Sequence, residues 1–182
     1  RKRGLMIAAV LFIISAVGSA YPEMGFPHGA PHTFLTQFII YRIIGGVGVG
    51  LASMLSPMYI AEMAPASRRG GLVAWNQFAI IFGMLVVYFV NYFIALNGDE
   101  AWLTSTGWRL MFLSEVIPAA LLFLLVLGVP ESPRWLIMKG RETKAVAILE
   151  RINGEPEAEA EVQSIRRSLH GTVKARLFSY GV

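Results

Sequence analysis

Two charged side chains stand inside strongly apolar stretches of the sequence. Arg42 is flanked by isoleucine, tyrosine and glycine residues, and Glu115 interrupts a leucine-rich stretch that ends at Val129. A charge inside a membrane is costly, so such a residue is a functional candidate by default. Arg42 could instead extend its guanidinium to a nearby interface, as long side chains close to the ends of spans commonly do. Glu115 could serve only as a polar contact between helices.

Gln77 is the candidate for binding a polar substrate. It follows Asn76 at the start of another apolar stretch. Its amide offers two donors and one acceptor, so it can hold neighbouring hydroxyl groups of a sugar. Amides also bridge membrane helices, and from the residues alone that structural role is favoured.

Two charged clusters follow apolar stretches and could act together. Glu62, Arg68 and Arg69 form the first cluster, and Glu131 and Arg134 form the second. If the preceding stretches end side by side, opposite charges come within reach and could hold helix ends together. A single exposed pair contributes only about 0–1 kcal/mol, so such a latch would need a network. The alternative is an ordinary solvated loop.

The composition excludes several classes of protein. The 182 residues are 55% hydrophobic and only 15% charged, whereas average soluble chains are roughly 45–50% apolar and 25% charged. The net charge of +4 is not gathered into a basic patch, so nucleic acid is not an expected partner. There is no cysteine, and the three histidines are scattered, so we expect no metal, no cofactor and no catalytic site.

Four apolar stretches have the length needed to cross a bilayer, which takes about 20 helical residues. They are Gly4–Ala20, Phe38–Ile60, Gln77–Leu96 and Leu110–Val129, joined by the polar or Gly- and Pro-rich connections 21–37, 61–76 and 97–109. A soluble bundle would show a polar stripe with a period of 3.6 residues, and residues 77–88 show none. The sequence therefore predicts an all-α membrane protein with four transmembrane helices.

Lysine and arginine predict the orientation. They occur before the first stretch, between the second and third, and after the fourth, whereas residues 21–37 and 97–107 contain none. Cytoplasmic loops are the ones enriched in these residues, so the basic segments are expected on the cytoplasmic side. Arg42 and Arg109 are the two exceptions, and both are expected near outer ends.

Three regions follow from this pattern. Residues 1–129 hold the four spans, and Gly46 and Gly50 in the second span form a small-residue motif that lets another helix approach closely. Residues 130–176 carry most of the charge and are expected to form a cytoplasmic linker of short amphipathic helices. One helical face carries Ala145, Ile148, Leu149 and Ile152, and a second carries Ala158, Val162, Ile165 and Leu169. Residues 177–182 are expected to begin a further span.

Several motifs are similar to those of a known family. Pro57-x-Tyr59-x-x-Glu62-x-x-Pro65-x-x-x-Arg69-Gly70 and Pro130-Glu-Ser-Pro-Arg134 resemble two patterns of the sugar porters of the major facilitator superfamily, and Gly107-Trp108-Arg109 also fits. The resemblance covers essentially the whole chain. Within the family it is strongest to bacterial symporters that carry D-xylose with protons, through residues 41–62 and 76–83.

The resemblance implies an architecture. The four spans would be helices three to six of a twelve-helix fold, and residues 130–176 would link its two halves. Such carriers bind their substrate near the midplane and expose it alternately to each side. The implied partners are a monosaccharide, protons, the lipid bilayer and the remainder of the same chain, in a bacterial inner membrane.

The resemblance also implies roles for single residues. Gln77 would hydrogen-bond sugar hydroxyls, which reverses the odds from the residues alone, and Arg42 would lie near the proton-linked aspartate of the first helix. The charges Glu62, Arg69, Glu131 and Arg134 would form the network that closes the cytoplasmic gate. The implied function is uptake of a monosaccharide, D-xylose in the first place, coupled to protons. The alternatives are an uncoupled sugar facilitator and a non-transporting sugar sensor, and an enzyme is not expected.

Overall fold

The computed structural model describes residues 1–24, 31–65 and 67–174, and all regular secondary structure in these residues is helical. Four helical segments are long and apolar enough to cross a membrane: Lys2–Ala20, Phe34–Met63, Arg69–Ala95 and Glu100–Gly128. The prediction of an all-α chain with four candidate transmembrane helices is therefore confirmed for the described residues. The further span expected at residues 177–182 lies outside the described residues.

The elements follow one another in a simple order. The first three spans contain α1 (Lys2–Ala20), α2 (Pro31–Met63) and α3 (Arg69–Ala95). The fourth is composite, with α4 (Glu100–Trp102), the π-helical turn η1 (Leu103–Gly107), α5 (Trp108–Ser114) and α6 (Val116–Gly128). The chain then forms α7 (Pro133–Met138), α8 (Glu142–Asn153) and α9 (Glu155–Lys174).

The helices extend beyond the apolar stretches that predicted them. Residues 61–76 were expected to form a connection, but α3 begins at Arg69 and only residues 64–68 separate it from α2. Residues 97–109 were likewise expected to be a connection, yet helix resumes at Glu100. Hydropathy marks the part of a helix that suits hydrocarbon, whereas the backbone continues its hydrogen bonding through the polar interface. The expected bounds were therefore too short.

The fourth span breaks at its middle. Glu115 separates α5 from α6, and its backbone N–H donates to the carbonyl of Phe112 at 3.1 Å, in a tighter turn than the α-helix. The cause is Pro118, which has no N–H to donate to Ser114 and whose ring crowds that carbonyl. The break lies where Glu115 interrupts the apolar sequence.

Small residues bring α1 and α2 close together. A Cβ on Gly45 would collide with the side chain of Ser15, and one on Gly48 would lie 3.2 Å from the ring of Phe12. Gly46 and Gly50 have nothing within 4 Å of an added Cβ among the described residues. The close contact among the described residues is therefore made by Gly45 and Gly48, and the expected approach of another helix at Gly46 and Gly50 stays a prediction. Gly45 and Gly48 are three residues apart and share the face that meets α1.

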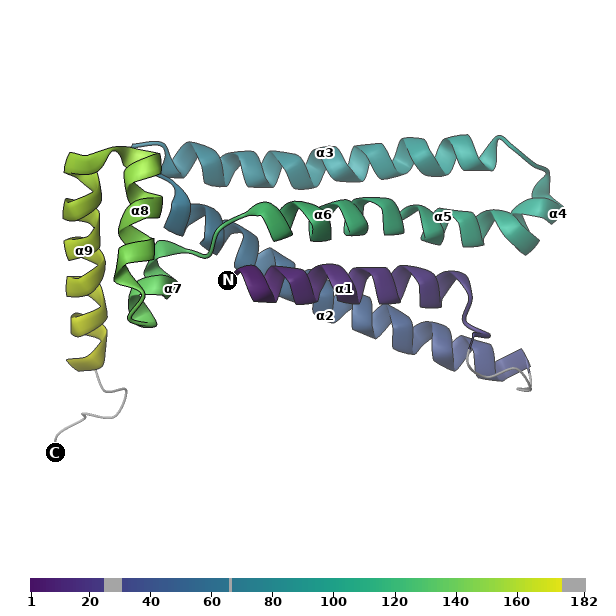
Figure 1. Cartoon of the computed structure of the whole chain (residues 1–182). Helices are drawn as coiled ribbons and strands as arrows, with labels where there is room; N and C mark the ends of the chain where they lie inside the picture. Colours follow the sequence, from purple (N-terminus) through teal and green to yellow (C-terminus); the bar gives the residue numbers. More distant parts are fainter. Residues whose placement is uncertain (25–30, 66, 175–182) are drawn as a thin grey trace, which may run out of the picture.

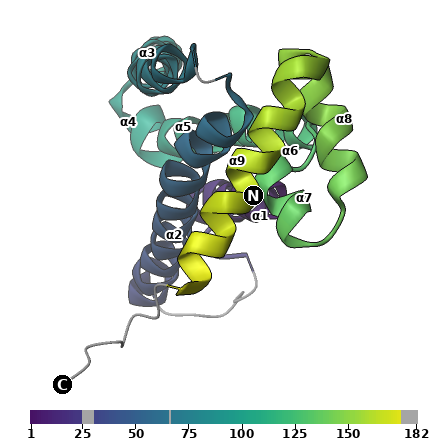
Figure 2. The same cartoon turned by 90° about the vertical axis from the view of Figure 1, so that its left-hand side faces the viewer.

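The helix α3 runs beside the other spans but buries none of its residues (Figures 1 and 2). It is apolar on all sides, and large side chains such as Trp75, Phe82 and Tyr88 are more than half exposed. A helix with this composition is stable only against lipid or against other helices.

Helices α7, α8 and α9 gather at one end of the spans and run across their direction (Figure 1). Leu149 of α8 forms a small core with Ala158 and Val162 of α9, and Ile165 packs against it. The two faces expected from the sequence thus pack against each other. Helix α9 exposes Glu157, Glu159, Arg166 and Arg167, whereas Glu161 is only partly exposed.

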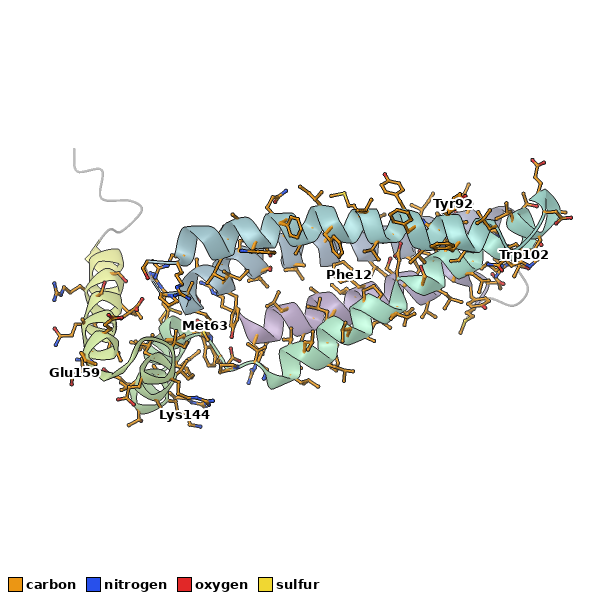
Figure 3. All side chains as sticks on the ribbon, turned by 90° about the horizontal axis from the view of Figure 1, so that it is seen from above. Phe12, Met63, Tyr92, Trp102, Lys144 and Glu159 are labelled. Carbon is orange, nitrogen blue, oxygen red and sulfur yellow. The ribbon has the colours of Figure 1, made fainter. Side chains whose placement is uncertain are left out.

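The basic segments share one end of the molecule. Figure 3 shows Lys144 and Glu159 at the end where Met63 closes α2, and Trp102 at the opposite end. Arg1, Arg69 and Arg134 all lie at the first end, because Arg1 and Arg134 line one cavity with Glu62, and Arg69 contacts α9. Connections with and without basic residues alternate along the chain, and they therefore lie at opposite ends of the molecule.

Candidate functional site

Two helix ends meet where the charged clusters were expected to meet. The hydroxyl of Tyr59, in the last turn of α2, donates to the carbonyl of Pro130 at 2.8 Å, just after α6. Ser132 then caps α7, because its hydroxyl accepts from the backbone N–H of Trp135 at 3.2 Å, and Pro133 occupies the first helical position. This is the local signature of a helix start. The cap places Glu131 and Arg134 on either side of the same turn.

Glu62 is the acidic centre of this inner charge cluster, which we define as Arg1, Glu62, Arg69, Glu131 and Arg134. The guanidinium of Arg1 binds the Glu62 carboxylate, with Nη2 at 2.9 Å and Nε at 3.2 Å from Oε1. A cavity of about 230 Å³ is lined by Arg1, Glu62 and Arg134. From the sequence, Arg1 was interpreted only as a basic residue that precedes the first span. No local pattern predicts its pairing with Glu62, which lies 61 residues away.

Arg69 reaches away from this carboxylate toward the linker. Its Nη2 lies 3.3 Å from Oε1 of Glu161 on α9 and 3.4 Å from the carbonyl of Ala64. A second cavity, of about 190 Å³, is lined by Glu62, Arg69, Arg134 and Glu161. Glu161 was missed as a partner because it belongs to a run of alternating glutamates in which nothing distinguishes it.

Glu131 occupies a different position from its neighbours. Its Oε2 atom is buried, has no hydrogen-bond partner among the described residues, and lies 3.8 Å from the backbone nitrogen of Arg1. The cluster thus gathers all four residues expected there, but its ion pairs run to Arg1 and Glu161.

The membrane-embedded pair Arg42–Glu115 is the second part of the candidate site. Nη1 of Arg42 lies 4.0 Å from Oε2 of Glu115, and its guanidinium lies over the ring of Phe112 at 5.3 Å. Both side chains are about half exposed, at 49% and 44%.

The helix around Arg42 is longer than expected. The sequence placed Arg42 about one turn from the outer end, because the apolar stretch was taken to begin at Phe38. The candidate span begins at Phe34, so Arg42 lies eight residues, or about 12 Å of helix, from its start. The carboxylate 4.0 Å away favours a functional role over extension to the interface.

Gln77 also lies further from the start of its helix than expected. It was taken to open its span, yet α3 begins eight residues earlier, at Arg69. Asn76 turns toward α2, where its Oδ1 accepts from the hydroxyl of Ser56 at 2.7 Å. Gln77 is exposed and has no hydrogen-bond partner among the described residues. Its amide is therefore available to groups outside this part of the chain.

The opposite end carries a compact ion pair that the sequence did not indicate. Arg109 donates to the carbonyl of Ala20 at 3.0 Å, binds Oε1 of Glu23, and lies over the rings of Tyr21 and Trp108. Burial raises the pKa of Glu23, but its own backbone N–H and the Arg109 guanidinium outweigh this, so the pKa lies below the ordinary value. This cluster ties the end of α1 to the start of α5.

No three His, Asp or Glu side chains gather into a possible ion site among the described residues. The candidate residues Gln77, Arg42 and Glu115 supply an amide, a guanidinium and a carboxyl group. These groups can bind hydroxyls, hold charge and exchange a proton.

Comparisons with known proteins agree on one group. Residues 1–181 match the family model "Sugar (and other) transporter". The chain is 56% identical to the D-xylose-proton symporter of Escherichia coli K12 over all of this chain and 39% of that protein. It is 42% identical to the arabinose-proton symporter of Bacillus subtilis 168, over 93% of this chain and 34% of that protein.

A solved structure matches equally well. A proton:xylose symporter of the major facilitator superfamily, bound to 6-bromo-6-deoxy-D-glucose, superposes with a TM-score of 0.92 at 56% identity. The match covers all of this chain and 40% of that one. The chain therefore spans about two fifths of the length of the relatives it matches.

Proposed function

This chain belongs to the sugar transporter family of the major facilitator superfamily, and we propose that it forms part of a carrier that takes up a monosaccharide together with protons. The observation that supports this most is the 56% identity to a D-xylose-proton symporter along the whole chain. D-Xylose is accordingly the proposed substrate. The complete protein would lie in a bacterial inner membrane, crossing it several times.

In this proposal the four spans are helices three to six of twelve, and residues 130–176 are the cytoplasmic linker between the two halves. Carriers of this type bind substrate at the midplane, between halves that move relative to one another. The apolar helix α3 supports this, because it buries none of its residues and so has surface to offer to further helices. The lipid bilayer and the remainder of the chain are its proposed partners.

Gln77 is proposed to bind sugar hydroxyls. Its amide is exposed on α3 and unpaired among the described residues, whereas the neighbouring Asn76 is already bound to Ser56. Two donors and one acceptor on a planar group suit two adjacent hydroxyls.

Arg42 is proposed to couple proton movement to transport. A guanidinium within the membrane stabilises a nearby carboxylate, and its release allows that carboxylate to bind a proton. Glu115 is the carboxyl group that the described residues place beside it, at 4.0 Å. The resemblance adds a first-helix aspartate outside this chain.

The inner charge cluster is proposed to close the cytoplasmic gate. Glu62, Arg69 and Arg134 line one cavity at the junction of α2, α3, α7 and α9. Contacts at such a junction can form in one state of the carrier and separate in the other. The pair between Arg69 and Glu161 joins the linker to this gate.

Proton coupling is favoured over the alternatives, an uncoupled facilitator and a sugar sensor, because both relatives named above are proton symporters by name. The test is uptake of labelled D-xylose into proteoliposomes that contain the complete protein. We expect an inside-alkaline pH gradient to drive accumulation above the external concentration, and a protonophore to abolish it. Equilibration to the external concentration, unaffected by the gradient, would show a facilitator instead.

A further inference from the structure

A pocket at the inner end carries cations without carboxylates. It measures about 660 Å³ and lies between the ends of α2 and α6 and the side of α8. Lys2 and Arg151 are its charged lining residues, and Met63, Ile148 and Ile152 supply apolar surface. No carboxylate is among its described lining residues. Such a surface favours an anion that also carries apolar groups.

The neighbouring groove is almost wholly apolar. It measures about 420 Å³, and Arg3 stands at its head. The remaining lining residues are Met6, Ile7, Val10, Leu11 and Phe123. From Arg3 to Leu11 the groove follows α1 for eight residues, or about 12 Å. Ile7 and Val10 are 54% and 41% exposed, so the groove opens outward from α1.

The pocket and the groove are neighbours along both helices that form them. Lys2 and Arg3 are consecutive on α1, and Phe123 and Leu127 are one turn apart on α6. Lys2 donates to the carbonyl of Leu127 at 2.7 Å, which holds its ammonium group beside a residue that lines the pocket. One elongated molecule with a charged head and an apolar tail could therefore occupy both.

The charges here are not compensated within the described residues. Arg1, the third cation of this terminus, is bound to Glu62. Neither Arg3 nor Arg151 forms an ion pair among the described residues, and Lys2 is bound only to a carbonyl. The two cations of the pocket and the one at the head of the groove thus have no acidic partner among the described residues.

We infer that this pocket and groove form a binding site for an anionic glycerophospholipid. Its phosphate would lie among Lys2, Arg3 and Arg151, and one acyl chain would lie along α1 in the groove. Basic pockets between spans on the cytoplasmic side have the chemistry to hold anionic headgroups. The inference needs only the membrane orientation, so it does not depend on which sugar is carried.

The test is native mass spectrometry of the complete protein in detergent, titrated with phosphatidylglycerol or with phosphatidylcholine of the same acyl chains. We expect tighter binding of phosphatidylglycerol. The double variant Arg3→Gln/Arg151→Gln should weaken it roughly 30-fold, since each cation near the surface contributes about a factor of 5. Binding of phosphatidylcholine should be unchanged. Lys2 is left intact because it also caps α6.

The matched control is Lys139→Gln/Lys144→Gln, which removes two exposed cations at the same end that line neither space. It should bind phosphatidylglycerol like the parent. Val10→Trp should weaken lipid binding by filling the groove without changing any charge. Equal affinity of the parent protein for the two lipids would overturn the inference. So would displacement of the lipid by soluble glycerol phosphate at equal concentration, because the tail would then contribute nothing.

Discussion

Arg42 and Glu115 were identified separately in the sequence, and the structure brings them together as a pair. Both residues were noticed because charge is rare in an apolar stretch. Their 4.0 Å separation joins α2 to the break between α5 and α6, and no spacing along the chain gives that distance. Pro118 predicts a break in the helix from the sequence alone. The distance between Glu115 and Arg42 depends on how α2 packs against α5 and α6, which the sequence does not give.

Replacing Arg42 by alanine in the complete protein should impair proton-driven D-xylose uptake more than exchange of labelled for unlabelled sugar. Exchange needs only binding and alternating access, whereas net accumulation also needs the proton site. The two rates are compared in the same proteoliposomes. Arg42→Lys keeps a charge but loses the planar guanidinium. Its rate of proton-driven uptake should lie between those of the parent and Arg42→Ala. Equal loss of both rates in Arg42→Ala would make Arg42 a structural residue.

Replacing Gln77 by alanine should weaken D-xylose binding about 10-fold, because one or two hydrogen bonds to neutral groups are lost at about 0.5–1.5 kcal/mol each. Isothermal titration calorimetry on the purified complete protein measures the change. The control is Gln163→Ala, which removes an exposed amide from α9. An affinity unchanged by Gln77→Ala contradicts the proposed role.

At the scale of elements, the type of each span was predictable and its ends were not. Apolar length identifies a membrane helix, but α3 continues for eight residues before Gln77, through Arg69 and Trp75. The apolar faces of α8 and α9 were predictable, because apolar residues recur with a period of 3.6 residues. Leu149 lies on this face of α8, and Val162 lies on the corresponding face of α9. The pattern could not predict that the apolar faces of α8 and α9 pack against each other, because this packing depends on the turn at Gly154 between the two helices.

The pair between Arg69 and Glu161 should hold α9 against the start of α3. Glu161→Gln should therefore speed amide hydrogen exchange in α9 (Glu155–Lys174), with little change in α1. The expected loss of stability is small, within about 1 kcal/mol, because the pair is partly exposed. Glu159→Gln removes an exposed glutamate of the same helix and serves as the control. Equal exchange in the two variants would show that the pair does not position the linker.

The outer cluster should respond to acid. The pKa of Glu23 is lowered in the folded protein, so its pair with Arg109 stabilises the fold above the ordinary carboxyl pKa of about 4.3. That contribution is lost as the pH falls through the lowered value. The thermal midpoint of the detergent-solubilised complete protein should thus decrease less between pH 7 and pH 3.5 in Glu23→Gln than in the parent. Parallel pH profiles of the two proteins would argue against this linkage.

On the scale of the whole molecule, the basic segments lie together at one end of the spans. Every basic segment expected on one side lies at the end formed by the start of α1, the start of α3 and helices α7–α9 (Figure 1). This result was predictable, because it follows from the count of lysine and arginine in each connection. The specific partners, Arg1 with Glu62 and Arg69 with Glu161, come only from the fold, since they join residues 61 and 92 positions apart.

The account rests at every scale on four helices that cross the bilayer with their basic ends together in the cytoplasm. The chain has no cysteine, so single cysteines can be introduced at Met24, Arg68, Glu100 and Lys144, with any cysteine elsewhere in the complete protein removed. A membrane-impermeant maleimide added to intact cells should label the cysteines at positions 24 and 100, and should label those at 68 and 144 only after the membrane is opened. Labelling of positions 68 and 144 from opposite sides, or of 68 and 100 from the same side, would contradict the account.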